Sequence, residues 1–370
     1  MRRRQAVALL GALGLPTAPG PFLAEPYLNA GPHPADPTRL TLLFHALENT
    51  GPYMVRTIRQ QTPAIANGQV YTATLSNLTP GETFPYQIAD ESGPLLHATA
   101  KSLPAKSQPF RMVLFGDSGQ QTPALKAIAA LAEAQNPDVF LHLGDIAYPN
   151  GTPAQYRANF FPIYRFLRTR PSFSVPGNHD IDASTAWYDY WSQPRNGPGN
   201  NFSVELGDTH WAMLDSNTHA DLNDPAFHCW LDQDLKNTTA LWRFVAIHHP
   251  PFTSGAHHFA EQQSRALCHI FQQNNVHAVF SGHDHNYQRS HPLLYRNGNI
   301  EVTPSGIPYI ISGGAGADLS DATNNPQPFT RIAKTVHSFT VLDITNRKLE
   351  LRQIDSNGRQ IDSLTLISQT

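Results

Sequence analysis

The stretch VFLHLGDIAY, residues 139–148, decides the fold of this chain. A short apolar run that stops abruptly at glycine and polar residues is typical of a buried strand. The residues that follow this run include Asp145 and Tyr148, and both side chains can bind a metal ion. The same arrangement recurs four more times, which predicts a sheet whose strands each end at a ligand.

The other four runs have the same form and lie at residues 111–119, 172–180, 244–251 and 277–285. In an open α/β sheet, ligands bind outside the carboxyl ends of the strands. We therefore expect the strand ends to bring seven candidate metal ligands together: Asp117, Asp145, Tyr148, Asn178, His248, His283 and His285.

The ligand types indicate the metal and the chemistry. Aspartate, asparagine, histidine and tyrosine suit Fe, Mn, Zn or Mg better than copper. Seven ligands are too many for one ion that keeps an open position, but they fit two ions that share one carboxylate. Two metals about 3.5–4 Å apart clamp the oxygens of an in-line displacement and generate hydroxide near neutral pH. The pattern predicts phosphoryl chemistry.

Composition restricts the other possibilities. The chain has 370 residues, enough for two domains, and a net charge of −3. No run of Lys or Arg continues past residue 4, so nucleic acid is not expected as a partner. The 31 prolines and 24 glycines indicate many turns rather than a helical protein.

Residues 1–24 have the features of a signal peptide. A basic start, Met1–Arg4, precedes the apolar stretch Ala6–Leu15, which is too short to span a bilayer. The adjacent arginines suggest a twin-arginine-like signal and export to the periplasm or outside the cell. The alternative is an ordinary N-terminal segment. No other stretch is long enough to cross a membrane.

Residues 25–104 predict an all-β sandwich. Alternation at Leu40–Phe44 and Val70–Leu75 indicates strands. The segment Leu78–Ile88 resembles the Leu-x-Pro-x-x-x-Tyr turn of fibronectin type III sandwiches, with Phe84 in the place of the tyrosine. We expect a fibronectin III-like domain without a chemical role, followed by a polar linker.

Residues 108–370 predict an α/β domain, because apolar runs alternate with helical periodicity. Helices are expected at 122–135, 154–168 and 261–274, and closing strands at 338–344 and 348–354. The strand at 309–312 enters a glycine-rich turn, which predicts close backbone approach near the site. The two cysteines, Cys229 and Cys268, could form a disulfide after export or remain free thiols.

Five motifs together carry a family resemblance: GDSG at 116–119, GDIAY at 144–148, GNHD at 177–180, VAIH at 245–248 and GHDH at 282–285. In this order the chain resembles a purple acid phosphatase, a family of the calcineurin-like metallophosphoesterase superfamily. The resemblance covers residues 111–289. It implies the metallophosphoesterase fold, a layered β-sandwich flanked by helices, preceded here by the all-β sandwich.

The resemblance also implies how the ligands divide between two metal ions. The first ion, Fe(III), would be held by Asp117, Tyr148 and His285. The second, a divalent Fe, Zn or Mn, would be held by Asn178, His248 and His283, with Asp145 bridging the two. Tyr148 is the distinguishing residue, since a phenolate bound to Fe(III) gives the family its colour. The alternative is that Tyr148 is a core tyrosine.

Three further histidines are implied to be catalytic. His179 follows the asparagine ligand, and His257 and His258 lie at the offset of a histidine pair in larger family members. His179 and His258 would bind phosphate or protonate the leaving alkoxide, and His257 would assist. Asp180 stands where glutamate is commoner in the family, and Asp284 stands between the paired histidines where a small or apolar residue is frequent. The extra carboxylate at Asp284 is expected to alter metal preference or pH optimum.

The expected function is hydrolysis of phosphomonoesters by in-line attack of a metal-bound hydroxide on a small phosphorylated substrate. One rival is phosphodiester, nucleotide or pyrophosphate hydrolysis with the same residues. Another is a non-catalytic phosphate-binding protein whose β domain carries the function. The physiological substrate and the oligomeric state stay open.

Overall fold

The structure is a computed structural model that describes residues 22–33, 35–47, 50–255 and 263–368. His257 and His258 lie outside these ranges, as do residues 1–21 of the expected signal peptide. Within the described residues, no helix has both the length and the apolar character needed to cross a membrane.

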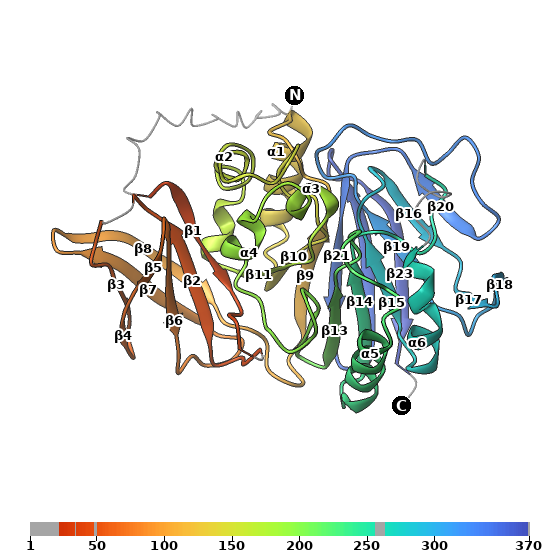
Figure 1. Cartoon of the computed structure of the whole chain (residues 1–370), viewed down its shortest axis with the longest axis horizontal. Coiled ribbons are helices and arrows are strands. Elements are labelled where there is room, and N and C mark those ends of the chain that lie inside the picture. The colour runs from red at the N-terminus through yellow and green to blue at the C-terminus, as the bar shows by residue number, and fades with distance from the viewer. Residues whose placement is uncertain (1–21, 34, 48–49, 256–262, 369–370) are drawn as a thin grey trace, which may run out of the picture.

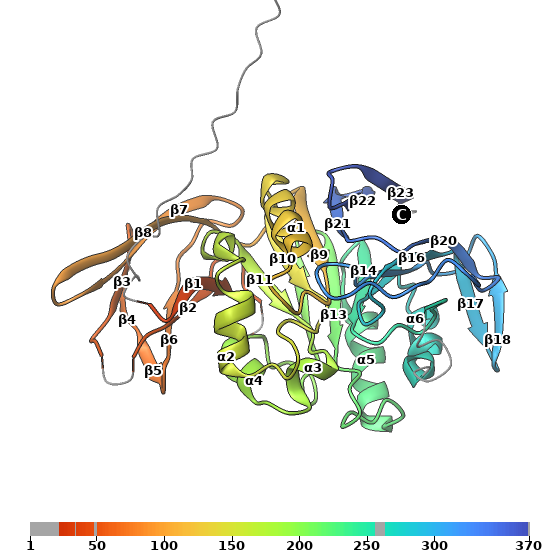
Figure 2. The same cartoon turned by 90° about the horizontal axis from the view of Figure 1, so that it is seen from above.

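Two large sheets face each other in the described part of the chain (Figures 1 and 2). The first has the order β23-β22-β21-β9-β10-β11-β1-β2-β6-β5, and the second β12-β13-β14-β15-β19-β16-β20. The strands of the first are β1 (Ala24–Asn29), β2 (Leu40–His45), β5 (Ile65–Asn67), β6 (Val70–Leu75), β9 (Phe110–Phe115), β10 (Val139–His142), β11 (Pro171–Ser174), β21 (Ser338–Ile344), β22 (Lys348–Asp355) and β23 (Gln360–Ile367).

The strands of the second sheet are β12 (Phe202–Leu206), β13 (Thr209–Leu214), β14 (Trp242–Ile247), β15 (Ala278–Ser281), β16 (Tyr287–Ser290), β19 (Tyr309–Ser312) and β20 (Thr330–Lys334). A four-stranded sheet and a hairpin complete the β-structure: β3 (Met54–Thr57), β4 (Gln61–Pro63), β7 (Thr83–Asp90), β8 (Gly93–Lys101), β17 (Leu293–Arg296) and β18 (Asn299–Val302).

The helices cover the outer faces of the sandwich: α1 (Pro123–Ala134), α2 (Pro153–Gln155), α3 (Asn178–Ile181), α4 (Ala186–Tyr190), α5 (Pro225–Asn237) and α6 (Cys268–Gln273). Residues of α1 and α4 pack in one apolar cluster with strands of the first sheet, and residues of α5 and α6 pack in another with strands of the second. The predicted α/β layered fold is therefore confirmed.

The main core lies between the two sheets. Large side chains of the second sheet, among them Trp211, Phe244 and Phe280, are buried in the same cluster as Leu141 and Phe173 of the first. Residues alternate along each strand between this core and the outer clusters: Leu141 faces inward, whereas Phe140 belongs to the cluster with the helices.

All five predicted strands are present, and they are divided between the two sheets of the layered β-sandwich that the resemblance implies. β9, β10 and β11 are parallel neighbours in the first sheet, whereas β14 and β15 are parallel neighbours in the second. The carboxyl ends from the two sheets lie at the same end of the sandwich, since side-chain atoms of Asp117 and Asp145 after β9 and β10 lie within 4.8 Å of His248 after β14. Their loops meet at one end of the sandwich.

The predicted helix at 122–135 is present as α1, and the Thr122 hydroxyl accepts a hydrogen bond from the Leu125 amide at its N-terminus. The one predicted at 154–168 is broken into α2, a π-helical turn at 156–160 and a 3-10 turn at 165–168. Pro162 lies between the two turns, and proline cannot continue a helix. Cys229 and Cys268 are free thiols, exposed and buried respectively.

The all-β region continues into the α/β region instead of forming a separate neighbouring unit. β1 pairs in parallel with β11, so β5, β6, β2 and β1 extend the same sheet that contains β9–β11. The sheet of β3, β4, β7 and β8 covers this extension, because residues of both sheets, such as Leu42 and Ile88, share one core. The two sheets form the expected all-β sandwich.

Asn29 connects the two regions where β1 meets β11. Its buried amide nitrogen donates to the carbonyl and the hydroxyl of Ser172, both at 3.0 Å, and its amide oxygen accepts from the Ser192 amide at 3.0 Å. One side chain thus satisfies backbone groups of two other segments, in a place that water cannot reach.

We predict that Asn29→Ala lowers the free energy of unfolding by about 2 kcal/mol, because it leaves buried polar groups without partners. Urea unfolding followed by circular dichroism measures the change. Gln61→Ala, on the exposed strand β4, is the control and should change stability by less than about 0.5 kcal/mol. Equal effects of the two substitutions would contradict the role of Asn29.

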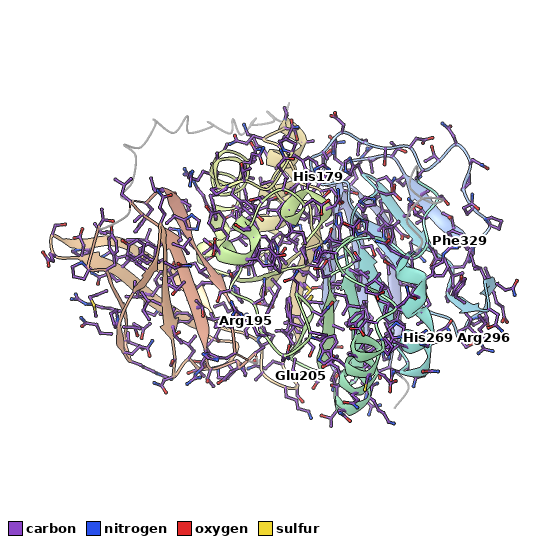
Figure 3. All side chains as sticks on the ribbon, in the orientation of Figure 1. His179, Arg195, Glu205, His269, Arg296 and Phe329 are labelled. Carbon is purple, nitrogen blue, oxygen red and sulfur yellow. The ribbon has the colours of Figure 1, made fainter. Side chains whose placement is uncertain are left out.

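A second polar cluster lies at the opposite end of the sheets from His179, near Glu205 (Figure 3). The His210 ring lies between two carboxylates, 2.9 Å from Glu205 Oε1 and 2.8 Å from Asp234 Oδ2. Burial alone lowers the pKa of His210, but the hydrogen bonds and charges of Asp234 and Glu205 outweigh it and raise that pKa to about 9.

His210 gives an expected pH dependence of stability. Because its folded pKa exceeds the ordinary value of 6.5, its contribution is fully present below pH 6.5 and is lost as the pH rises through about 9. We predict that the free energy of unfolding falls across this window in the wild type and falls less in His210→Gln. Urea titrations at several pH values measure the difference, and identical slopes would be evidence against it.

Candidate metal centre

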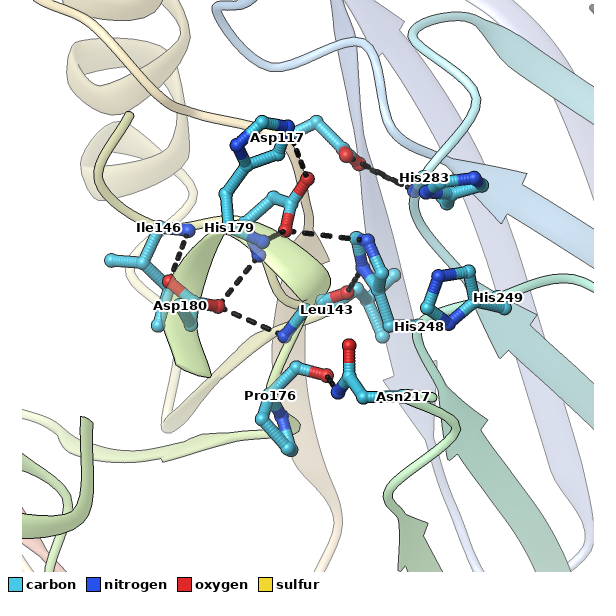
Figure 4. A network of polar contacts seen from close by, with 12 residues as sticks. Asp117, Leu143, Ile146, Pro176, His179, Asp180, Asn217, His248, His249 and His283 are labelled. Atoms are coloured by element: carbon cyan, nitrogen blue, oxygen red, sulfur yellow. Dashed lines mark hydrogen bonds and ion pairs between the residues drawn. The ribbon is translucent and has the colours of Figure 1, made fainter. Parts of the chain in front are cut away.

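The predicted ligands lie together at the loop end of the sandwich, as Figure 4 shows for part of the set. Asp117 follows β9, Asp145 and Tyr148 follow β10, and Asn178 begins α3. His248 follows β14, and His283 and His285 follow β15. Potential ligand atoms of Asp117, Asp145 and His248 lie within 4.8 Å of one another, and so do those of His248, His249 and His283.

Three of these residues have a backbone that side chains rarely adopt. Asp117, Asp145 and His283 have φ angles of 59°, 57° and 69°, in the left-handed region. Strain of this kind persists only where the surroundings determine it, and it is concentrated at functional sites. Each residue comes directly after a glycine, and the reversed backbone turns its side chain into the space between the sheets' ends.

The first group of expected ligands, Asp117, Tyr148 and His285, is in contact without a metal. The Tyr148 hydroxyl lies 2.9 Å from His285 Nε2 and donates to Asp145 Oδ2 at 3.1 Å. His285 Nε2 is also 3.7 Å from Asp117 Oδ1. The other ring nitrogen of His285 lies 2.7 Å from the Asp318 carbonyl, so Nδ1 donates and Nε2 faces the site. The structure therefore places Tyr148 among the site residues.

The second group shows how the residues present would suit a metal. His248 Nδ1 lies 2.7 Å from the Leu143 carbonyl, which directs the buried Nε2 toward Asp145 Oδ1, 3.4 Å away. Within the described residues, Asn178 Oδ1 is buried without a hydrogen-bond partner. Buried polar atoms are normally satisfied. An unsatisfied amide oxygen and an imidazole oriented through its other nitrogen are what a metal site requires.

Two carboxylates buried this close together affect each other and the nearest imidazole. Burial raises the pKa of Asp117 well above its usual range, and the charge of Asp145 adds to the effect. Burial also acts to raise the pKa of Asp145, but His248 and its hydrogen bond hold that pKa well below its usual range. Despite burial, the charge and hydrogen bond of Asp145 raise the pKa of His248 to about 10. The two buried carboxylates therefore favour the binding of cations at this site.

His179 occupies the open side of the site. Its backbone amide donates to Asp145 Oδ1 at 2.9 Å, and its Nε2 is 3.9 Å from Asp145 Oδ2. Its Nδ1 lies 2.6 Å from the Pro149 carbonyl, and its side chain is 41% exposed. The ring can therefore meet a substrate from solvent. The structure does not place His257 or His258, which are outside the described residues.

Asp180 has a role that the sequence did not reveal. Its carboxylate accepts hydrogen bonds from the backbone amides of Asp145, Ile146 and Gly177, at 2.8, 2.9 and 2.9 Å (Figure 4). It ties together the two loops that carry Asp145 and Asn178. Its position three residues after Gly177, where a carboxylate caps a helix start, was the available signal.

Two contacts of the second sheet were also missed. His249 Nδ1 lies 2.8 Å from the Ser216 hydroxyl, and the His249 ring lies 4.4 Å from the ring of His283. Nothing in the spacing of His249 distinguishes it from a turn residue, because its partner comes from another strand. The predicted close approach of the glycine-rich turn is confirmed, since a side chain at Gly313 would meet the Asp117 carboxylate.

Comparisons with known proteins agree with this geometry. Residues 110–287 match the family model described as calcineurin-like phosphoesterase. Purple acid phosphatase 21 of Arabidopsis thaliana is 23% identical over 267 residues, which cover 68% of this chain and 59% of that protein. A nucleotide pyrophosphatase/phosphodiesterase of Hordeum vulgare is 23% identical over 317 residues, covering 72% of this chain and 85% of that protein.

Among solved structures, a purple acid phosphatase from seeds of yellow lupin (Lupinus luteus) superposes with a TM-score of 0.79 at 18% identity, covering 93% of this chain and 74% of that one. The chain spans about three-fifths of the length of the first curated relatives. Residues 110–287 thus match the calcineurin-like phosphoesterase family model, and the predicted resemblance of the chain to purple acid phosphatases is confirmed.

Proposed function

We propose that this protein hydrolyses phosphomonoesters at a dinuclear metal centre. The observation that supports the proposal is that potential ligand atoms of Asp117, Asp145 and His248 lie within 4.8 Å of one another. Beside them, Asn178 Oδ1 is buried without a hydrogen-bond partner among the described residues. The family supports a phosphoesterase with two metal ions. The preference for monoesters and the identity of the two metals are part of this proposal.

The residues would divide between the ions as the resemblance implies. Asp117, Tyr148 and His285 would hold Fe(III). Asn178, His248 and His283 would hold a divalent Fe, Zn or Mn, and Asp145 would bridge the two. When bound, such a pair supplies positive charge for the phosphoryl oxygens and a hydroxide nucleophile near neutral pH. The two buried carboxylates and the oriented imidazoles fit that charge.

The protein's own groups position the substrate and handle its proton. His179 is held through Nδ1 by the Pro149 carbonyl, so its exposed Nε2 can bind a phosphoryl oxygen or protonate the leaving oxygen. His258 is proposed for the same step, with His257 assisting. Asp180 keeps the Asp145 and Asn178 loops in register, which preserves the spacing of the ligands.

A second candidate is hydrolysis of phosphodiesters or pyrophosphates at the same centre. This second function is supported by the similarity of the chain to a protein named nucleotide pyrophosphatase/phosphodiesterase. Turnover of an aryl monoester, an aryl diester and ATP separates the two functions. We also propose that residues 1–24 direct export.

Loss of single ligands tests the centre. We predict that Asp117→Asn and His248→Ala lower the bound metal by at least one ion and lower monoester turnover by about a thousandfold or more, since groups acting on the transition state contribute on this scale. Metal analysis and kinetics on the same samples measure both. His269→Ala, at an exposed position on α6, is the matched control. Full activity in a variant shown to lack metal would contradict the proposal.

Tyr148 has its own spectroscopic test. Protein purified without chelator is predicted to carry about two metal ions per chain and a broad visible absorption band, as expected for a phenolate bound to Fe(III) in a two-metal site. Tyr148→Phe should abolish the band while the protein stays folded. Two metals without a band would reject Fe(III) at Tyr148 and leave a colourless dinuclear centre.

A further inference from the structure

Two neighbouring hollows near the candidate metal centre have no role in the proposed function so far. A hollow of about 370 Å³ is lined by Tyr188, Asn200, Asp215, His219, Asp221 and other residues. A second hollow of about 320 Å³ shares Tyr188 and Asn200 with it and extends past Trp187, Gln193 and Arg195. The two hollows are adjacent, because they share lining residues, and they are called here together the Asn200 groove.

Both walls of the Asn200 groove begin at the candidate metal centre. Leu214 at the end of β13 pairs with Ile247 at the end of β14. The residues that follow these two strands, Asp215 and His248, are therefore neighbours. The Asn217 amide donates to Asp215 Oδ1 at 2.8 Å and to the Pro176 carbonyl at 3.1 Å, just before the Gly177-Asn178 loop. Asp215, which lines the inner hollow, is therefore linked through Asn217 to the segment that leads into Asn178.

The opposite wall comes from the same loop. Tyr188 is on α4, which follows α3, and α3 begins with Asn178. The Tyr188 side chain is 43% exposed and faces the hollow together with Asn200, whose amide lies 3.4 Å from the Tyr188 hydroxyl. A flat ring beside the centre can pack against this exposed aromatic surface.

The inner hollow has a negative lining. Asp215, Asp221 and Asp224 contribute carboxylates, and none of the described residues that line it is Lys or Arg. The buried Asp215 is held by His219 Nε2 at 2.8 Å and by the Asn200 amide at 2.7 Å. An anionic group here meets charge of its own sign in a partly enclosed space, where the repulsion is stronger than in water.

The outer hollow has different chemistry. Gln193 is 6% exposed, and neither atom of its side-chain amide has a hydrogen-bond partner among the described residues. Buried amides are normally satisfied, by protein, water or ligand. Arg195 lines the same hollow from an exposed position. A bound molecule that reaches the outer hollow can therefore form hydrogen bonds with Gln193 and Arg195 through its polar groups. The inner hollow has no such pair among its described lining residues.

We propose that the Asn200 groove binds the alcohol part of the phosphomonoester and selects alcohols that carry a ring or apolar surface, and no negative charge, next to the ester oxygen. This inference rests on the proposed function, because it places the phosphate at the metal centre. Anionic leaving groups such as ADP are disfavoured, since their charge falls opposite Asp215 and Asp221.

The test compares phenyl phosphate, glycerol 2-phosphate and ATP on the metal-loaded full-length protein. Asp221→Lys replaces a negative charge at the exposed rim of the groove. We expect it to raise kcat/KM for ATP by about three- to tenfold relative to phenyl phosphate, mainly through KM, because it replaces repulsion by attraction. Glu133→Lys makes the same charge change at an exposed position on α1 that lines neither hollow, and it should change both substrates equally.

A second variant tests whether the ring of the substrate packs against Tyr188. Tyr188→Ala should raise KM for phenyl phosphate several-fold and leave glycerol 2-phosphate unchanged, because only the former loses a packing surface. The groove is rejected if Asp221→Lys behaves like Glu133→Lys, if Tyr188→Ala affects both monoesters alike, or if wild-type protein prefers ATP. Failure to hydrolyse any of the three substrates, with two metals bound, would instead reject the proposed function itself.

Discussion

The rest of the structure depends on the burial of two carboxylates a few ångströms apart. Asp117 and Asp145 are almost entirely removed from water, and such charges are costly unless positive charge or hydrogen-bond donors offset them. The chain supplies part of the offset from its own backbone: the His283 amide donates to Asp117 at 2.9 Å and the His179 amide to Asp145 at 2.9 Å. The imidazole of His248 supplies another part, and the proposed metal ions would supply the remainder.

The face-to-face packing of two sheets explains how these groups come together. Strands of one sheet carry Asp117, Asp145 and Asn178, and strands of the other carry His248 and the histidines after β15. The acidic ligands and most of the imidazoles therefore arrive from opposite sides of the same core. Trp211, Phe244 and Phe280 pack on one another on the inner face of the second sheet, and they share one buried core with Leu141 and Phe173 of the first sheet. This core holds the two halves of the site together.

Much of this arrangement could be predicted from the sequence, because its signals are local. An apolar run followed by Gly-Asp specifies both a strand and the residue at its end, so the strands, the order of the ligands and the α/β class followed from short segments. The layered β-sandwich was implied only by the family resemblance, and the residues alone did not give the pairing order, since strand pairing depends on contacts between distant segments. Pro162 was a local signal against a continuous helix at 154–168, and periodicity outweighed it. The roles of Asp180 and His249 arise from partners on other loops, which spacing does not reveal. The division into domains at residues 104–108 stays a prediction.

The parallel pairing of β1 with β11 has a consequence for how the two regions can be separated. In the full chain, β11 is a central strand with hydrogen-bonded neighbours on both sides. A protein cut at the linker would keep β11 as an unprotected border of a flat, apolar sheet, with a row of open amides and carbonyls ready to join another chain. The all-β sandwich therefore also covers an edge of the α/β region at which chains could otherwise associate, and this role requires no chemistry of its own.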